Sequence, residues 1–166
     1  MIELKDLTFE NVNQIINIKR RFNQRKFVQK AGHTIAMAYA GINEGYPGFL
    51  SAIYNDDVPV GLILMGKAPV ADTEPEILKK YNYVYRVVGF LIDKNSQNQG
   101  IGRRAFKLAL DKIKEYEHEA ALPIALECHV KNKYALALYE FFKFKKLGIT
   151  SDNNYILARL PEELFD

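Results

Sequence analysis

The sequence has little cysteine, little net charge and no long apolar run. Its 166 residues include one cysteine, Cys128, so no intrachain disulfide and no thiolate cage for a metal can form. The 23 lysines and arginines and 20 aspartates and glutamates leave a net charge of +3, too small to favour binding to a phosphate backbone. No apolar run approaches the roughly 20 residues that a membrane span needs, and the first residues lack the basic-then-apolar pattern of a signal peptide. We therefore expect a soluble cytoplasmic protein that binds neither nucleic acid nor membranes.

Composition and patterning favour one globular domain. Apolar residues make up 48% of the chain and charged residues 26%, as is typical of globular proteins. The length suits a single domain over residues 1–166, and no internal repeat or linker interrupts it. The hydrophobic periodicity predicts a mixed α/β (α+β) fold, a sheet with helices on both faces. The expected strands are residues 2–7, 49–54, 58–66, 81–93, 124–130 and 155–160, and the expected helices are residues 8–22, 26–40, 100–116 and 131–142.

The segment that carries chemistry lies between the long β-rich run and the third helix. Residues 90–104 read FLIDKNSQNQGIGRR, so a polar loop leads into a helix that opens on two glycines. Glycines there let the backbone approach a ligand closely, and the unpaired N–H groups with the helix dipole favour a phosphate. A nucleotide P-loop is excluded because no Lys-Ser or Lys-Thr follows the glycines. A dinucleotide site fits poorly, since such sites follow the first strand of a parallel sheet.

Two motifs carry a resemblance to the GNAT family of N-acetyltransferases. Gln97 to Gly102 match the family pattern Q/R-x-x-G-x-G/A, and residues 127–140, ECHVKNKYALALYE, resemble its second conserved segment. The resemblance implies a GNAT-like fold, with a mixed and mostly antiparallel central sheet flanked by helices on both faces. It also implies acetyl-CoA as cosubstrate, without a metal, a small-molecule amine as acceptor, and a possible homodimer. No metal-ligand spacing is found among His33, His118 and His129.

The same resemblance implies which residues bind coenzyme A. The backbone of the strand that precedes the loop would pair with the pantetheine arm, and main-chain N–H groups of the loop would bind the pyrophosphate. Gln97 either contacts the ligand or fixes the loop shape, and Asn132 either reaches the coenzyme arm or caps the last helix. The strand residues are Phe90, Leu91 and Ile92, and the loop residues are Asn98, Gln99, Gly100, Ile101, Gly102 and Arg103.

Acetyl transfer requires a base for the amine and an acid for the leaving thiolate. Tyr139 occupies the position of the family's general acid, although it also fits a packed aromatic on the last helix. Glu127 is the candidate base, with His129 or a water chain as alternatives. The glutamate that some members carry earlier in the long strand is replaced by Val88. Arg86 in the same strand needs a partner, and Glu127 is a candidate for it.

The acceptor is weakly encoded. An acidic insert over residues 71–80, with Asp72, Glu74 and Glu76, would attract polyamines. Residues 26–39 and 53–61 resemble bacterial spermine/spermidine acetyltransferases, which implies a polyamine acceptor. Another amine, such as an antibiotic, an amino acid or a protein N-terminus, and a non-catalytic acyl-CoA sensor remain alternatives.

Three further features lead to structural expectations. A cluster of cations, Lys19, Arg20, Arg21, Arg25 and Lys26, is expected to form the solvated face of the first helix. Gly89 in the long strand predicts a bulge or a close backbone approach. Lys143 replaces a glycine that family members often carry where the last helix ends, which concerns the helix cap rather than the chemistry.

Overall fold

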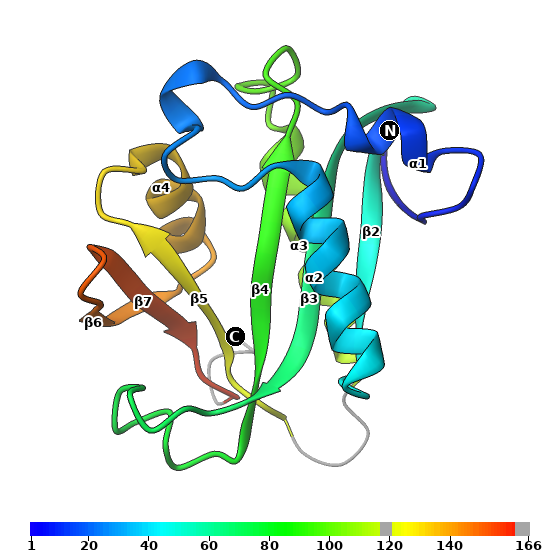
Figure 1. Ribbon diagram of the computed structural model, residues 1–166. Helices are drawn as coiled ribbons and strands as arrows, with labels where there is room; N and C mark the ends of the chain where they lie inside the picture. Colours follow the sequence, from blue (N-terminus) through cyan, green and yellow to red (C-terminus); the bar gives the residue numbers. More distant parts are fainter. Residues whose placement is uncertain (117–120, 162–166) are drawn as a thin grey trace. The chain divides into compact units, whose positions relative to one another are not determined.

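The strands form one mixed sheet, as expected. The structure is a computed structural model that describes residues 1–116 and 121–161. The strand order is β1-β2-β3-β4-β5-β7-β6. Pairs β1–β2, β2–β3, β5–β7 and β6–β7 are antiparallel, and β4–β5 is parallel. This confirms the prediction of a mostly antiparallel sheet with flanking helices (Figure 1).

The chain divides into two compact units by its internal contacts. Unit 1 comprises Met1–Gly66 and Val88–Tyr116, and unit 2 comprises Lys67–Val87 and Glu117–Asp166. The expectation of a single domain stays a prediction. No helix in the described part of the chain is long and apolar enough to cross a membrane.

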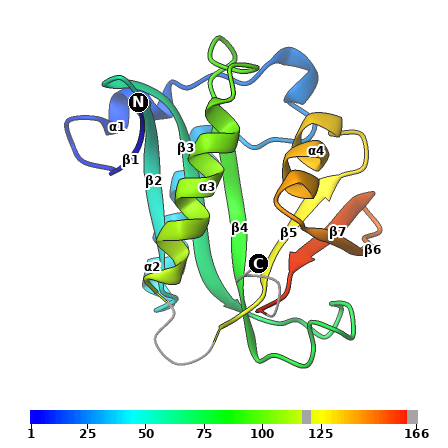
Figure 2. The same ribbon diagram turned by 180° about the vertical axis from the view of Figure 1, so that it is seen from behind.

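Unit 1 holds the N-terminal strands with helices on both of their faces. Figure 1 shows α2 in front of these strands, and Figure 2, seen from behind, shows α3 on their other face. The buried cluster beneath α1 and α2 includes Ile15, Ala31 and Leu62, whereas Ile101, Phe106 and Ile113 form the buried stripe of α3. The elements are β1 (Ile2–Asp6), α1 (Val12–Ile16), η1 (Phe22–Gln24), α2 (Ala31–Asn43), β2 (Gly48–Asn55), β3 (Val58–Pro69), the end of β4 (Tyr83–Ile92) and α3 (Ile101–Lys114).

The first helix is much shorter than its sequence pattern predicts. We expected a helix over residues 8–22, but α1 ends at Ile16. The side-chain amide of Asn17 donates to the backbone carbonyl of Asn13 (2.7 Å). The backbone N–H of Lys19 donates to the Asp93 carboxylate (3.0 Å) instead of to a helical carbonyl. A tertiary contact has therefore overridden helix propensity. The second helix is displaced as well, since α2 begins at Ala31 rather than at residue 26.

Gly89 is a position of close approach, but by a side chain rather than by the backbone that was expected. A Cβ atom at Gly89 would lie 2.6 Å from Cγ2 and 2.7 Å from Oγ1 of Thr34. Thr34 is a buried residue of α2. Glycine therefore allows α2 to pack directly against β4.

Unit 2 is built around the antiparallel pair β5–β7. The insert between β3 and β4 supplies Leu78 to a cluster with Val84, Ala125 and Ile156. Its elements include the start of β4, β5 (Ile124–His129), α4 (Lys133–Phe141), β6 (Lys145–Ile149) and β7 (Asn154–Arg159). The sequence pattern does not predict β6, because this exposed edge strand carries two lysines and a glycine and lacks apolar alternation.

Helix α4 ends in a Schellman motif with lysine at the left-handed position. Lys143 has φ 64°, its N–H donates to the carbonyl of Glu140 (2.9 Å), and the N–H of Phe144 donates to the carbonyl of Tyr139 (3.0 Å). The rings of Tyr139 and Phe144 lie 5.9 Å apart and supply the apolar contact that accompanies this motif. Lys143 thus belongs to the helix cap, as expected.

Candidate functional site

The loop between β4 and α3 is held at its start by Asp93. Its carboxylate accepts from the N–H groups of Lys19 (3.0 Å) and Asn95 (2.9 Å), and its carbonyl accepts from the N–H of Ser96 (2.9 Å). The N–H of Lys94 donates to the carbonyl of Lys19 (2.8 Å). These contacts bend the chain away from β4 and fix the first turn of the loop.

Gln97, the first residue of the loop motif, fixes the shape of the loop. Its Nε2 donates to the carbonyl of Ile92 (2.9 Å) and to Oε1 of Gln24 (2.9 Å). Its Oε1 accepts from Nε2 of Gln24 (3.1 Å). Both ends of the Gln97 amide are therefore used within the protein, which agrees with the second of the two roles considered for it.

The rest of the loop presents a run of main-chain N–H donors. Asn98 and Gly100 have φ angles of 65° and 73°, left-handed values that turn successive peptide groups toward one side. Within the described ranges 1–116 and 121–161, the backbone N–H groups of residues 97–102 form no hydrogen bond of good geometry with a protein acceptor. Helix α3 begins at Ile101, so its dipole adds to their positive potential. The arrangement suits a diphosphate.

The strand before the loop offers a backbone edge. β4 pairs with β5 through Tyr85↔Ile124 and Arg86↔Ala125, and this ladder ends at Arg86. The peptide groups of Phe90, Leu91 and Ile92 lie beyond it, which is compatible with the expected pairing to an extended ligand arm.

Glu127 lies on β5 with an exposed carboxylate. Its Oε2 accepts from Nδ2 of Asn154 on β7 (3.2 Å). His129, the alternative base, uses Nδ1 to accept from the N–H of Lys131 (3.2 Å). Each candidate base thus accepts a hydrogen bond from the protein, and the choice between Glu127 and His129 stays a prediction.

Tyr139 is buried on α4. Burial, with a smaller contribution from the neighbouring Cys128, raises the pKa of its phenol well above the usual range. Burial also raises the pKa of the Cys128 thiol, from 9.0 to about 12. Tyr139 is thus a protonated phenol at neutral pH that can donate a hydrogen bond or a proton, and it is at the same time the packed aromatic that the pattern allows.

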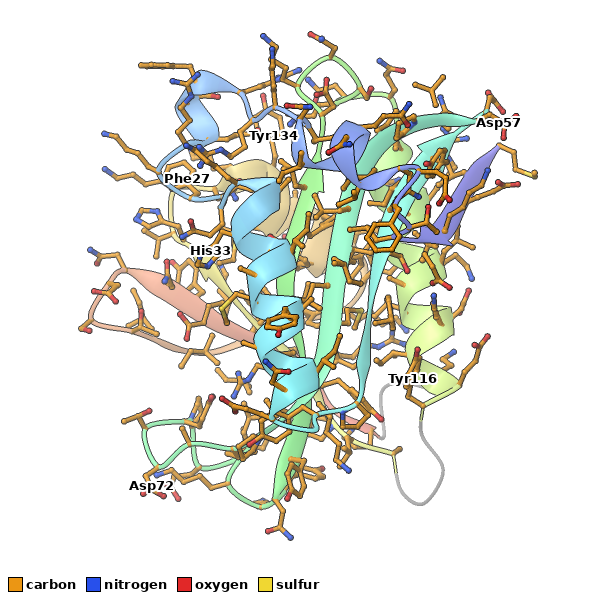
Figure 3. The ribbon with its side chains drawn as sticks, turned by 45° about the vertical axis from the view of Figure 1, so that its right-hand side comes forward. Phe27, His33, Asp57, Asp72, Tyr116 and Tyr134 are labelled. Atoms are coloured by element: carbon orange, nitrogen blue, oxygen red, sulfur yellow. The ribbon has the colours of Figure 1, made fainter. Side chains whose placement is uncertain are left out.

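Arg86 does not pair with Glu127, contrary to the candidate pairing above. Its guanidinium forms a largely buried ion pair with Glu74 of the insert. Glu76 pairs with Lys79 (2.7 Å). Two of the three carboxylates that were expected to attract polyamines are therefore matched by cations. Asp72 lies at the outer bend of the insert (Figure 3).

Asn132 caps α4. Its Oδ1 accepts from the N–H of Ala135 (3.4 Å), as expected of a helix N-cap. Its side-chain amide NH₂ remains the group with which it can reach a coenzyme.

The basic cluster is not a solvated helix face. It lies after the end of α1, and Arg20 donates to the carbonyl of Val28 (2.6 Å). The side-chain amide of Asn98 lies against the Arg21 guanidinium, and the amide orientation that satisfies both groups places its oxygen 3.2 Å from both terminal guanidinium nitrogens. Sequence reasoning also missed Gln24, whose amide pairs with Gln97. In the sequence, only the high density of positive charge around Arg21 and Gln24 indicated that this segment could take part in binding.

No group of three or more potential metal ligands gathers among the residues that the structure describes. One histidine considered above, His118, lies outside these residues.

Comparison with known families decides the assignment. The family model of the acetyltransferase (GNAT) family matches residues 12–144. The chain belongs to the GNAT family. It is an acetyl-CoA-dependent acyltransferase. Both its fold and the backbone N–H groups of residues 97–102 fit acetyl transfer to an amine. A search of curated proteins found no significant match.

Solved GNAT structures share the fold over almost the entire chain. The PaiA N-acetyltransferase from Thermoplasma acidophilum, solved with coenzyme A, is 14% identical with a TM-score of 0.66, covering 96% of this chain and 99% of that one. Spermidine N-acetyltransferase from Vibrio cholerae, solved with CoA and spermine, is 15% identical with a TM-score of 0.64, covering 99% of this chain and 98% of that one. The ribosomal-protein-S18-alanine N-acetyltransferase from Escherichia coli is also 15% identical, with a TM-score of 0.63, covering 97% of this chain and 94% of that one. Small-molecule and protein acetyltransferases are both among these structures.

Proposed function

We propose that this GNAT enzyme acetylates the primary amine of a small molecule, and that a polyamine such as spermidine or spermine is the acceptor. The observation that carries the coenzyme half of the proposal is the run of backbone N–H groups over residues 97–102, which donate no hydrogen bond of good geometry to any part of the chain that the structure describes. N–H groups gathered at the start of a helix favour an anion, and a diphosphate supplies several acceptors at once.

The residues of the loop and the strand before it bind the coenzyme in this proposal. Backbone groups of the strand pair with the pantetheine arm, the amides of the loop hold the diphosphate, and Gln97 acts by holding the loop. Asn132 contributes its amide NH₂. The strand residues are Phe90, Leu91 and Ile92, and the loop residues are Asn98, Gln99, Gly100, Ile101, Gly102 and Arg103.

Acetyl-CoA supplies an activated acetyl group as a thioester. Glu127 takes the proton from the attacking amine, since its carboxylate is exposed and oriented by Asn154. Tyr139, whose buried phenol is protonated at neutral pH, gives its proton to the thiolate as the C–S bond breaks. The new C–N bond replaces the C–S bond, so one proton passes in net from the amine to the coenzyme thiol.

The choice of acceptor rests on similarity to other enzymes and on the charge of the insert. The similarity to a spermidine N-acetyltransferase and the resemblance of residues 26–39 and 53–61 support a polyamine. The ion pairs Glu74–Arg86 and Glu76–Lys79 lower the negative charge that the insert offers to a polycation. A protein N-terminus is the second candidate, since a ribosomal-protein acetyltransferase shares the fold equally well.

An amine panel tests the proposal. The protein is incubated with acetyl-CoA and spermidine, spermine, aminoglycosides, amino acids or peptides, and release of coenzyme thiol is followed with a disulfide reagent. Cys128 is buried, so the background from the protein is low. Mass spectrometry of the product should show one added acetyl group on the polyamine.

Turnover of peptides alone would replace polyamine by a protein N-terminus as the acceptor. Tight coenzyme binding without turnover of any amine would instead favour an acyl-CoA sensor. The remaining expectations, a possible homodimer without a nucleic-acid or membrane partner, are part of the proposal and are checked by light scattering and by binding assays.

A further inference from the structure

The basic segment between α1 and α2 lies against the coenzyme loop within unit 1. Residues 19–30 contain six lysines and arginines and no acidic residue. Figures 1 and 2 show the segment passing the end of β4, where the loop begins, and Phe27 marks it in Figure 3. A concentration of one charge beside a run of N–H groups raises the positive potential there.

Four hydrogen bonds fix this segment to the loop. Lys19 exchanges two hydrogen bonds with Asp93 and Lys94 (3.0 and 2.8 Å). The Gln24 and Gln97 amides bond to each other reciprocally (3.1 and 2.9 Å). The segment is therefore held in place by the same residues that shape the loop.

Gln24 also determines where Arg21 lies. Its Oε1, which accepts from Gln97, accepts in addition from the backbone N–H of Arg21 (3.3 Å). The Arg21 guanidinium then lies against the side-chain amide of Asn98, and with the amide oxygen turned toward it that oxygen accepts from both terminal nitrogens (3.2 Å). Asn98 belongs to the amide run, so a half-buried cation is positioned at the edge of the anion site.

We propose that Arg21 is a further ligand of the coenzyme diphosphate, and that Gln24 is the positioning residue that holds it there. A guanidinium carries more N–H donors than one amide oxygen can accept, and its planar fork matches phosphate oxygens. The remaining donors of Arg21 bind the diphosphate next to the loop amides. This inference rests on the proposed coenzyme site and adds to it a residue far from the sequence motif.

The test compares three variants by isothermal titration with acetyl-CoA. Arg21→Gln keeps a donor for Asn98 but loses the charge, and Arg21→Lys keeps the charge but loses the fork. Arg25→Gln is the matched control, because Arg25 lies on the same segment, exposed, over the ring of Phe22 (5.1 Å). A charge-assisted hydrogen bond predicts a dissociation constant about 10- to 100-fold higher for Arg21→Gln. We expect partial recovery for Arg21→Lys and a change of less than about twofold for Arg25→Gln.

A second readout separates phosphate binding from general damage. S-acetylpantetheine carries the same thioester without the diphosphate, so Arg21→Gln should leave its kcat/KM unchanged. Gln24→Ala should weaken acetyl-CoA binding less than Arg21→Gln does, because it leaves the charge of Arg21 in place.

Two results overturn the inference. If Arg21→Gln binds acetyl-CoA as tightly as Arg25→Gln does, Arg21 only locks the loop, and the proposed function stands. If Arg21→Gln also lowers the kcat/KM of S-acetylpantetheine to the same degree, Arg21 does not act through phosphate. Failure of the unaltered protein to bind acetyl-CoA would refute the proposed function itself, and this inference with it.

Discussion

Replacing Gly100 by glutamate separates folding from coenzyme binding. A Cβ atom at Gly100 would meet no heavy atom within 4 Å, so the side chain itself causes no clash in the protein. The cost to folding is that of holding a residue with a side chain at φ 73°, about 1–2 kcal/mol. We therefore expect a folded variant with a modestly lower melting temperature.

The cost to binding is much larger. A carboxylate about 4 Å from a phosphate oxygen costs about 4 kcal/mol at an effective dielectric constant near 20, which corresponds to a roughly thousandfold higher dissociation constant. Isothermal titration with CoA measures it, with Gly100→Gln as the control of equal size and without the charge. Circular dichroism verifies that both variants fold. A folded Gly100→Glu variant that binds CoA as tightly as the unaltered protein would refute the assignment of the loop.

Three other predictions concern unit 2. Tyr139→Phe keeps the packing of the ring but removes the acid, so kcat should fall at least tenfold while acetyl-CoA binding is retained; an unchanged kcat would remove Tyr139 as the acid. The buried Cys128 thiol should resist alkylation until the protein unfolds. Its pKa is raised from 9.0 to about 12 in the native state, so the native state holds this proton more tightly than the unfolded state does. The free energy of unfolding should therefore decline as pH rises from 9.0 toward 12, and less so in Cys128→Ala; equal declines would contradict this. Lys143→Gly relieves a left-handed lysine and should stabilise the protein by about 1 kcal/mol, or about 2–4 °C in Tm; a lower Tm would argue against the cap geometry.

Much of the fold follows from local pattern. The apolar stripe of α3 and the β-branched residues of β4 predict these elements to within a few residues, because burial of one face decides their periodicity. The chain after α1 could not be predicted in this way. The N–H of Lys19 bonds to Asp93, and a contact between residues so far apart in sequence leaves no periodic trace.

The candidate site shows the same division. The amide run of residues 97–102 follows from the glycine spacing, since only a loop that opens a helix leaves so many donors unpaired. Gln24 and Gln97 are 73 positions apart, and nothing in the local sequence indicates that their amides meet. Likewise, Arg86 requires some acidic partner, but only the folded insert identifies it as Glu74.

The most direct test of the account is to follow the backbone amide resonances of the protein while acetyl-CoA is added. The account predicts that the largest shifts occur in residues 97–102, whose N–H groups acquire phosphate acceptors, and that S-acetylpantetheine does not reproduce them. Unshifted amides across residues 97–102 at saturating acetyl-CoA would contradict it.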